Sequence, residues 1–239
     1  IYGKETGCAG GKGGSMHLID INAGLIAAVP IVGSTIPIGV GLAWANKLDM
    51  SKKIVVIFFG EGATEEGVFY ESINFAALHS LPVLFVCENN YFSVYSNLSK
   101  RQPKKRKIFN VAKSMGIESK SINGNDVEKV FLTTKKLVKN IRYNQKPFLI
   151  ELSTYRFLEH CGPNNDDNLN YRTEKEITFW KKKCPIENYK KKLVREKIID
   201  NKYLDLIYKK IDLEIKNSFR YAQKSKFPNN SKLLKNIYA

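Results

Sequence analysis

The sequence predicts an α/β protein with a mostly parallel sheet flanked by helices and a helical C-terminal extension. Residues 54–92 read as buried strand, glycine turn, amphipathic helix and second buried strand, and a unit of this length places its two strands parallel with a right-handed crossover. From Glu174 onward the pattern is helical and rich in Lys. We therefore expect an α/β domain over residues 1–173 and a helical extension over residues 174–239 that packs on the same domain.

Short apolar runs predict the strands. Residues 54–59 are continuously apolar, β-branched or aromatic, which is typical of a strand covered on both faces of a parallel sheet. Similar or shorter runs predict further strands at residues 27–32, 83–87, 117–122 and 147–152.

Apolar spacing and caps predict the helices. Phe69, Ile73 and Ala76 fall on one stripe of a helix that begins at Glu65. Further helices are predicted over residues 35–48, 109–115, 125–143 with a capping box of Asn125 and Glu128, and 174–226 with a break at Pro185.

Composition bounds the functional class. The 239 residues, 43% of them hydrophobic, fit one sizeable α/β domain with a real core. The net charge of +16 would ordinarily raise nucleic acid as a partner, but much of the excess is diffuse Lys in the last third of the chain, which indicates solvated helix faces. The six cations between Lys100 and Lys107 are assigned to a solvated, flexible loop, with a nucleic-acid site as the alternative.

Cysteine usage and hydropathy indicate the compartment. The four cysteines, at positions 8, 87, 161 and 184, have no C-x-x-C spacing, which argues for a reducing compartment and against a disulfide framework or a zinc site. Because no apolar run reaches membrane length and no secretory leader is visible, we expect a soluble, cytoplasmic protein.

Polar residues follow two of the predicted strands. Glu61 comes directly after the first, and Asn89 and Asn90 follow the next. Ligands of open parallel sheets bind outside the carboxyl ends of the strands, where these oxygens can converge. A carboxylate, an amide and a backbone carbonyl suit Mg²⁺ when a phosphate supplies further ligands, and Gly60 and Gly62 would let a diphosphate approach the backbone. An ordinary strand-to-helix turn with a polar cap is the alternative.

A second polar segment, residues 154–172, follows the last predicted strand. Loops at strand carboxyl ends often carry the chemistry of α/β proteins. With Arg156 nearby, we favour a catalytic role for His160 over a role in capping the loop through hydrogen bonds. His17, in a glycine-rich loop, would by itself be assigned a structural role.

Several of these motifs together resemble one enzyme family. The Gly60-Glu61-Gly62 turn and the Asn89-Asn90 pair resemble the thiamine diphosphate motif, a GDG triplet followed at a distance by NN. The segments GGSMHL at residues 13–18, IVG at 31–33 and YRFLEHCGP at 155–163 resemble the alpha subunit of the first component of 2-oxo acid dehydrogenase complexes, of the pyruvate and acetoin dehydrogenase type.

The resemblance implies a site for thiamine diphosphate and Mg²⁺. The implied metal ligands are Glu61, Asn90 and the carbonyl of Phe92, and the implied cofactor-binding residues are Ile31, Val32, Gly60, Glu61, Gly62, Ala63, Asn90, Phe92, Val94, Arg156 and His160. Among these, the backbone around Val32 would bond the aminopyrimidine ring, Val94 would prop the bent cofactor, and His160 would be the catalytic residue.

The family also implies partners. Because its beta subunit carries the carboxylate that activates the cofactor, the resemblance implies an alpha2beta2 heterotetramer. This enzyme would decarboxylate a 2-oxo acid, pyruvate first, and pass the acyl group to the lipoyl domain of an acyltransferase. By the same comparison the chain looks N-terminally truncated. Glu61 stands where the motif has Asp, and Cys161 stands where mitochondrial relatives carry a phosphorylatable serine.

Three alternatives stay open. They are an acetoin dehydrogenase, a transketolase-like thiamine diphosphate enzyme, and a non-catalytic basic scaffold motivated by the charge of +16 and by Glu61. The YRFLEHCGP segment argues against the transketolase type, and metal-dependent cofactor binding would exclude the scaffold.

Overall fold

The computed structural model describes residues 1–232 and 235 of the chain. The chain divides into two compact units, one formed by residues 32–190 and the other by residues 1–31 together with 191–239. The two domains predicted from the sequence, with a boundary at residue 173, stay a prediction. The larger unit holds all the strands assigned in the described residues.

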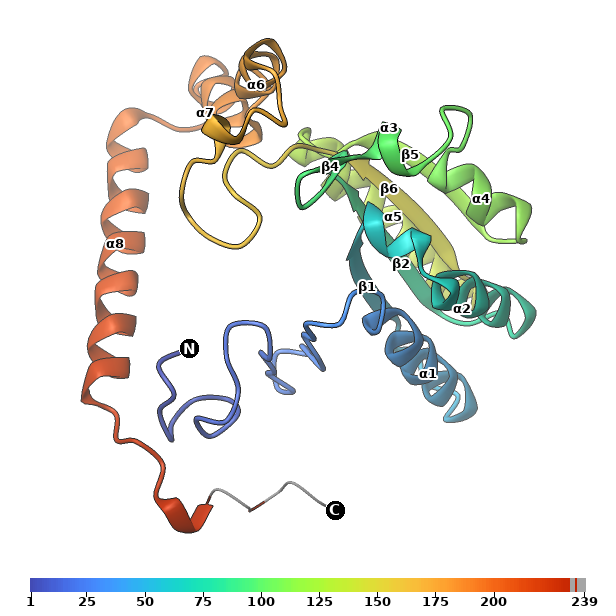
Figure 1. The fold of residues 1–239 in the computed structure, drawn as a ribbon, viewed down its shortest axis with the longest axis horizontal. Coiled ribbons are helices and arrows are strands. Elements are labelled where there is room, and N and C mark those ends of the chain that lie inside the picture. The colour runs from blue at the N-terminus through green and yellow to red at the C-terminus, as the bar shows by residue number, and fades with distance from the viewer. Residues whose placement is uncertain (233–234, 236–239) are drawn as a thin grey trace. The chain divides into compact units, whose positions relative to one another are not determined.

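Four parallel strands form the sheet of the larger unit (Figure 1). Their order is β1 (Val55–Gly60), β2 (Val83–Asn89), β6 (Phe148–Ser153) and β5 (Glu118–Asn123). Gly60 pairs with Glu88, and Asn89 pairs with Ser153, so three adjacent strands end at nearly the same level. The parallel α/β fold predicted from the sequence is confirmed.

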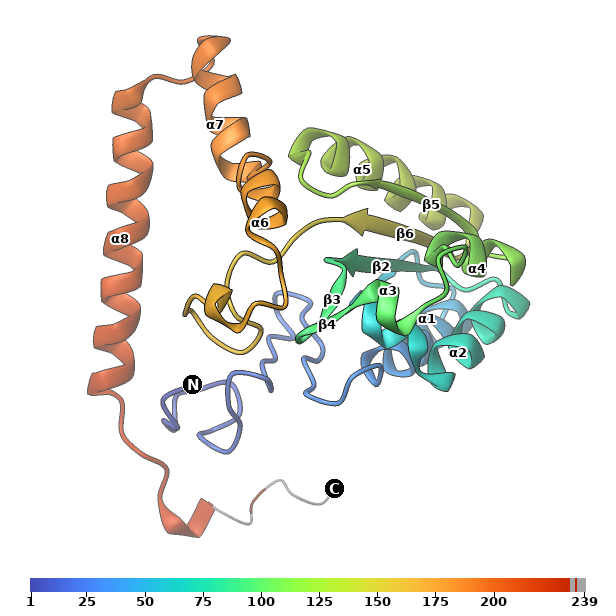
Figure 2. The same cartoon turned by 45° about the horizontal axis from the view of Figure 1, so that its top comes forward.

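Helices cover both faces of this sheet (Figure 2). They are α1 (Thr35–Leu48), α2 (Gly67–Leu78) and α4 (Ile108–Ser114) on one face and α5 (Val127–Asn144) on the other. The first three form one buried cluster with strand residues that include Phe59 and Phe85. The fourth forms a second cluster with Leu84 and Val86. The core therefore fixes the strands from both sides.

The edge strand β1 departs from the expected burial. Ile57 and Phe59 point into the first cluster, whereas Val56 and Phe58 are 39% and 62% exposed. The expectation that this strand is covered on both faces is therefore wrong for the described residues. A continuous apolar run does not tell an edge strand from a central one, because both have the same residue preferences.

Two other local predictions are corrected. Residues 27–32 form no strand, and Pro30 within them has no N–H to donate to a strand ladder. The turn after β1 is a 3-10 helix, η1 (Glu61–Glu65), so α2 begins at Gly67 instead of at residue 65. The two helices are separate because Glu66 between them has an extended backbone, with φ −76° and ψ 140°.

The cap of α5 lies one residue later than predicted. Asp126, and not Asn125, accepts the N–H of Lys129, at 3.0 Å. The Asn125 side chain instead accepts the Thr154 hydroxyl and donates to the carbonyl of Lys183, so it ties α5 to later segments.

The remaining elements are short strands and helices. A hairpin and a helical turn that the sequence did not predict follow β2, the Lys-rich region forms three helices, and one short 3-10 turn lies before it and another after it. They are β3 (Phe92–Ser93), β4 (Ser96–Asn97), α3 (Leu98–Arg101), η2 (Asp167–Leu169), α6 (Glu174–Lys181), α7 (Pro185–Arg195), α8 (Asn201–Lys224) and η3 (Asn230–Lys232). In the smaller unit, α8 has no buried residue, and the rings of Tyr2 and Phe219 meet edge to face with centroids 6.2 Å apart.

The four cysteines are free thiols. Burial raises the pKa of the Cys87 thiol, and the charges of Glu151, Glu61 and Glu88 raise it further, so this thiol stays protonated and serves packing. Among the helices of residues 1–232, none has the length and apolar content needed to cross a membrane.

Candidate functional site

Three loops leave the sheet at one edge. Because β1, β2 and β6 are parallel and end at nearly the same level, the segments after Gly60, Asn89 and Ser153 emerge next to one another. The turn η1 contacts both β2 and β3. The loop that carries Glu61 therefore lies against the hairpin that begins at Phe92.

The two glycines of the turn do different work. A Cβ added at Gly62 would lie 2.9 Å from Ser93 Oγ, so Gly62 is required for the close approach of the turn to β3. A Cβ added at Gly60 would meet nothing within 4 Å. Inside the turn, Thr64 donates its hydroxyl to the carbonyl of Glu61 at 2.7 Å. Gly60 is thus the glycine with room for a ligand beside its backbone.

The two asparagines also have different surroundings. Asn89 is 3% exposed, and its Nδ2 donates to Glu151 Oε1 at 2.8 Å while its Oδ1 accepts the N–H of Tyr91 at 3.0 Å. Asn90 is half-buried, and its Oδ1 accepts the N–H of Phe92 at 2.9 Å. An amide oxygen has a second lone pair, so Asn90 can also ligate a metal, whereas Asn89 is committed to the fold.

Glu61 is buried against an arginine that the sequence did not single out. The carboxylate is 1% exposed, and its Oε1 accepts Nη2 of Arg101 at 2.6 Å. The same guanidinium bonds Glu65 through Nη1 and donates from Nε to the carbonyl of Ser96 at 3.2 Å. The predicted metal ligand is therefore one partner of an ion pair.

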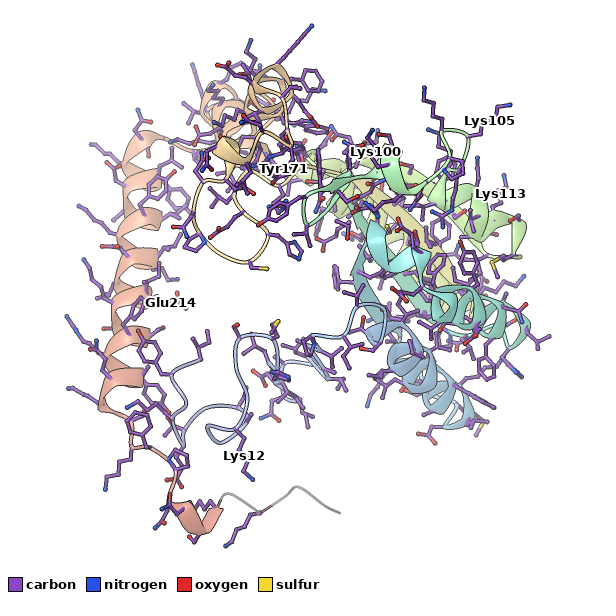
Figure 3. All side chains as sticks on the ribbon, in the orientation of Figure 1. Lys12, Lys100, Lys105, Lys113, Tyr171 and Glu214 are labelled. Carbon is purple, nitrogen blue, oxygen red and sulfur yellow. The ribbon has the colours of Figure 1, made fainter. Side chains whose placement is uncertain are left out.

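The basic loop, residues 100–107, is anchored by its two arginines, and its lysines are solvated. All of its lysines are exposed, and Lys105 points away from the sheet (Figure 3). Arg106 donates to the carbonyl of Thr64 at 2.8 Å and to the Tyr70 hydroxyl at 2.9 Å. The prediction of a solvated loop is therefore wrong for Arg101 and Arg106. The planar guanidinium of Arg can bond several acceptors at once. The presence of Arg instead of Lys at these two positions was therefore the sequence feature that could have indicated anchored side chains.

Val94 turns the hairpin between β3 and β4 with a left-handed backbone. Its φ is +53°, a conformation that costs a β-branched residue on the order of 1–3 kcal/mol. Arg156 donates from Nη2 to the carbonyl of Val94 at 2.7 Å and from Nη1 to that of Leu158 at 2.6 Å. Arg156 therefore ties the backbone of the hairpin at Val94 to the loop after β6.

A buried ionic network fixes the loop after β6, where Tyr171 lies (Figure 3). Asp166 and Arg172 are 4% and 5% exposed and form a hydrogen-bonded ion pair, and the Tyr171 hydroxyl donates to Asp166 at 2.6 Å. Burial by itself raises the pKa of Asp166. The Tyr171 bond and the charges of Arg172 and Arg156 outweigh burial, so the pKa lies below its ordinary value. The loop is thus held in one conformation.

His160 stands exposed on this loop. It forms no hydrogen bond with the described part of the chain, so a capping role is not seen and the imidazole is accessible. Ile31 and Val32 are 71% and 65% exposed and lie on either side of the boundary between the two units. The Ala63 side chain lies in the core, so only its backbone faces the turn. The cofactor contacts predicted for these residues stay predictions.

The donor types and the space at the sheet edge fit thiamine diphosphate and Mg²⁺. Glu61, Asn90 and the carbonyl of Phe92 are hard oxygen donors, and the open backbone at Gly60 can receive a phosphate. Among the described residues, no group of three or more His, Cys, Asp or Glu could hold a metal. A site that combines one carboxylate, one amide and one carbonyl with a diphosphate needs no such group. The metal would have to share Glu61 with Arg101.

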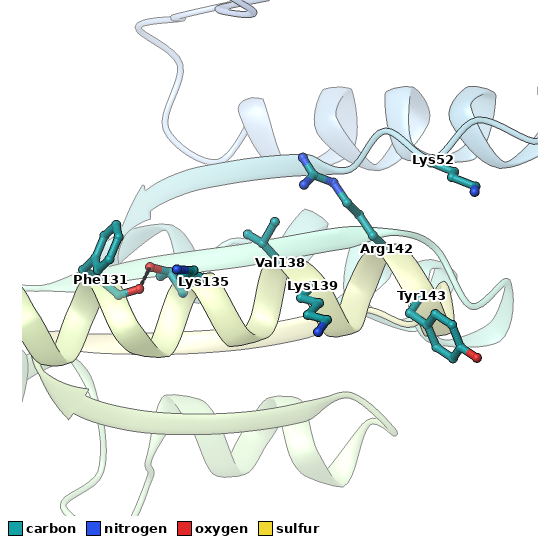
Figure 4. A pocket seen from close by; sticks show the side chains of 8 residues that line it. Lys52, Phe131, Lys135, Val138, Lys139, Arg142 and Tyr143 are labelled. Atoms are coloured by element: carbon teal, nitrogen blue, oxygen red, sulfur yellow. Dashed lines mark hydrogen bonds between the residues drawn. The ribbon is translucent and has the colours of Figure 1, made fainter.

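A separate hollow of about 990 Å³ lies beside α5 (Figure 4). Its lining is basic and apolar, and it consists of Lys52, Phe131, Thr134, Lys135, Val138, Lys139, Arg142 and Tyr143. None of the predicted site residues contributes to it, and it offers no carboxylate for a metal. The size of the hollow therefore does not make it the candidate site.

Known proteins resemble this chain over its whole length. A family model described as the dehydrogenase E1 component matches residues 1–231. The pyruvate dehydrogenase E1 component subunit alpha of Rickettsia bellii is 33% identical over 238 residues, which cover 100% of this chain and 72% of that protein. The protein of the same name from Rickettsia typhi is 34% identical over 243 residues, with the same shares. Subunit alpha-3 of the chloroplastic enzyme of Arabidopsis thaliana is 33% identical over 246 residues, which cover 56% of it.

Proposed function

This chain belongs to the dehydrogenase E1 component family, whose enzymes depend on thiamine diphosphate, and we propose that it is the alpha subunit of an enzyme that decarboxylates pyruvate. One observation carries the proposal more than any other. The Glu61 turn meets the Phe92 hairpin at the carboxyl edge of three parallel strands, where an α/β sheet binds its ligand. The relatives named pyruvate dehydrogenase support pyruvate as the substrate.

The metal ligands come from two loops. Glu61 supplies a carboxylate, Asn90 an amide oxygen and Phe92 its carbonyl, while the backbone at Gly60 receives the diphosphate. Bound thiamine diphosphate supplies a sink for the electrons left behind when CO₂ departs. The chain contributes orientation, because the turn and the hairpin are fixed to each other before any ligand arrives.

The hairpin and the loop after β6 supply further residues that would hold the cofactor. Val94 would contact it from the tip of the hairpin, where Arg156 bonds the carbonyl of Val94. Ile31 and Val32 would present backbone groups to the aminopyrimidine ring. His160 lies on the loop that Arg156 anchors, and its accessible imidazole moves a proton during acyl transfer.

A beta subunit completes the active site in an alpha2beta2 heterotetramer in the cytoplasm. The acyl group passes to the lipoyl domain of an acyltransferase component. The lysines of the basic loop are exposed close to the arginines that anchor it, and they offer an acidic lipoyl domain a positive surface.

Activity of the assembled subunits tests this proposal. The chain is co-purified with its beta partner, and pyruvate decarboxylation is followed with an artificial electron acceptor, with and without thiamine diphosphate and Mg²⁺. We expect activity from the pair only when both ligands are present, and none from this chain alone. Acetoin and a branched-chain 2-oxo acid are tested in parallel, and faster turnover of either would replace pyruvate as the substrate. Decarboxylation by the single chain would contradict the shared active site.

A further inference from the structure

The Glu61–Arg101 ion pair lies at the point where the proposed metal binds. We propose that Arg101 is a positioning residue that competes with Mg²⁺ for the Glu61 carboxylate and so sets the metal affinity of the site. This inference rests on the proposed function, because it assigns Glu61 to the metal. It concerns a residue that has no contact with the substrate in that function.

The competition follows from geometry and charge. Arg101 Nη2 lies 2.6 Å from Glu61 Oε1, and the two side chains are only 13% and 2% exposed, so water screens the pair weakly. Mg²⁺ requires octahedral contacts of about 2.0–2.1 Å, which the carboxylate has to turn to supply. A guanidinium that remained bonded to the same oxygen would place a positive charge beside the dication. The metal and the arginine therefore oppose each other.

Arg101 also bonds two acceptors other than Glu61. Its Nη1 bonds Glu65, and its Nε donates to the carbonyl of Ser96 at 3.2 Å. Gln102 donates to the same carboxylate oxygen of Glu65 at 2.8 Å and fixes it. When Glu61 turns to the metal, Arg101 keeps these two contacts. The exchange thus needs a rotation of one glutamate side chain, and the loop stays in place.

The length of Glu61 brings the pair within reach. A shorter carboxylate would end about one C–C bond, roughly 1.5 Å, earlier. An aspartate at this position would therefore leave Arg101 bonded to Glu65 and to the carbonyl of Ser96. Its carboxylate would be available to the metal without a competing bond.

Metal titration of the assembled alpha and beta subunits tests the proposal. Mn²⁺ serves as the probe, with thiamine diphosphate at a fixed concentration, and the free ion is measured by electron paramagnetic resonance. Arg101→Gln removes the charged hydrogen bond that competes with the metal, so we expect Mn²⁺ to bind at least about tenfold more tightly to this variant. Glu61→Asp should tighten binding in the native background and add little in the Arg101→Gln background, because both changes break the same bond.

Arg106→Gln is the matched control. It removes an arginine of the same loop that bonds Thr64 and Tyr70 instead of Glu61, so the Mn²⁺ affinity should stay within about twofold even if the loop loosens. Thermal unfolding of each variant checks that it folds, and if Arg101→Gln does not fold, Glu61→Asp alone decides. Equal affinity in the native protein and Glu61→Asp, or weaker binding in Arg101→Gln, would overturn the competition while the proposed function stands. If the native protein and all variants fail to bind Mn²⁺, the competition and the proposed function are both overturned. If only the variants bind Mn²⁺, the competition holds and the native chain is not a metal enzyme.

Discussion

Substitution of the two neighbouring asparagines should affect different properties, stability for Asn89 and metal-dependent cofactor binding for Asn90. Asn89→Ala removes a hydrogen bond to the buried Glu151 carboxylate at 2.8 Å and another from the N–H of Tyr91 at 3.0 Å. The first is worth about 1.5–3 kcal/mol and the second about 1 kcal/mol, and the site is only 3% exposed, so water cannot replace them. We expect the free energy of unfolding to fall by about 3 kcal/mol.

Asn90→Ala should spare stability and abolish metal-dependent binding. It removes one hydrogen bond, from the N–H of Phe92 at 2.9 Å, at a half-buried position, so the loss of stability should be about 1 kcal/mol or less. Loss of a direct metal ligand should weaken binding of thiamine diphosphate in the presence of Mg²⁺ by at least about a hundredfold.

Urea unfolding and calorimetric cofactor titration measure the two effects. Each variant is compared with the native chain in the assembled alpha and beta pair for binding, and alone for unfolding. The reasoning would be refuted if Asn89→Ala were as stable as the native chain, or if Asn90→Ala bound the cofactor normally. It would also be refuted if both changes affected stability equally, because the structure assigns only Asn89 to the core of the fold.

Three further predictions concern packing, pH and the loop histidine. Gly39→Ala places a Cβ 2.4 Å from Ile57, so overpacking should lower the free energy of unfolding by about 1–3 kcal/mol and lower the thermal midpoint with it. Gly41→Ala lies in the same helix and meets nothing within 4 Å, so it should raise the midpoint slightly. The carboxylate of Asp166 has a lowered pKa in the folded protein. Its contribution to stability is therefore full above the unfolded pKa of about 3.9 and is lost as the pH falls through the lower folded value. The difference in free energy of unfolding between the native protein and Asp166→Asn, measured by urea unfolding, should shrink only at acid pH. His160→Ala should lower the turnover number by about a hundredfold or more in the electron-acceptor assay, and unchanged turnover would remove His160 from the mechanism.

Much of the fold could be predicted because its signals are local. The helix over residues 35–48 and the strand at residue 83 carry continuous apolar patterns, and the structure has both elements there. The exposed face of β1 could not be predicted, since burial depends on which neighbours the strand receives. The helix start after Glu66 was also missed, because a 3-10 turn and an α-helix share the same early residue preferences.

The types of metal-binding residue in the site could be predicted from the sequence, but the ion pair between Glu61 and Arg101 could not. The oxygen donors Glu61 and Asn90 are recognisable because they follow strands and belong to a known motif. The partner of Glu61 lies forty residues later in a run of cations that reads as solvated. Only tertiary structure shows that Arg101 turns inward while the neighbouring lysines remain exposed. Pairing across such a separation leaves no periodic signal in one sequence.

Calorimetric titration of thiamine diphosphate into the assembled alpha and beta subunits tests the central claim most directly. The claim is that the edge formed by the Glu61 turn and the Phe92 hairpin is a metal-dependent cofactor site. Saturable binding in the presence of Mg²⁺, and its loss when the metal is chelated, is the predicted result. Binding that is equally tight without Mg²⁺, or no binding under either condition, would contradict it.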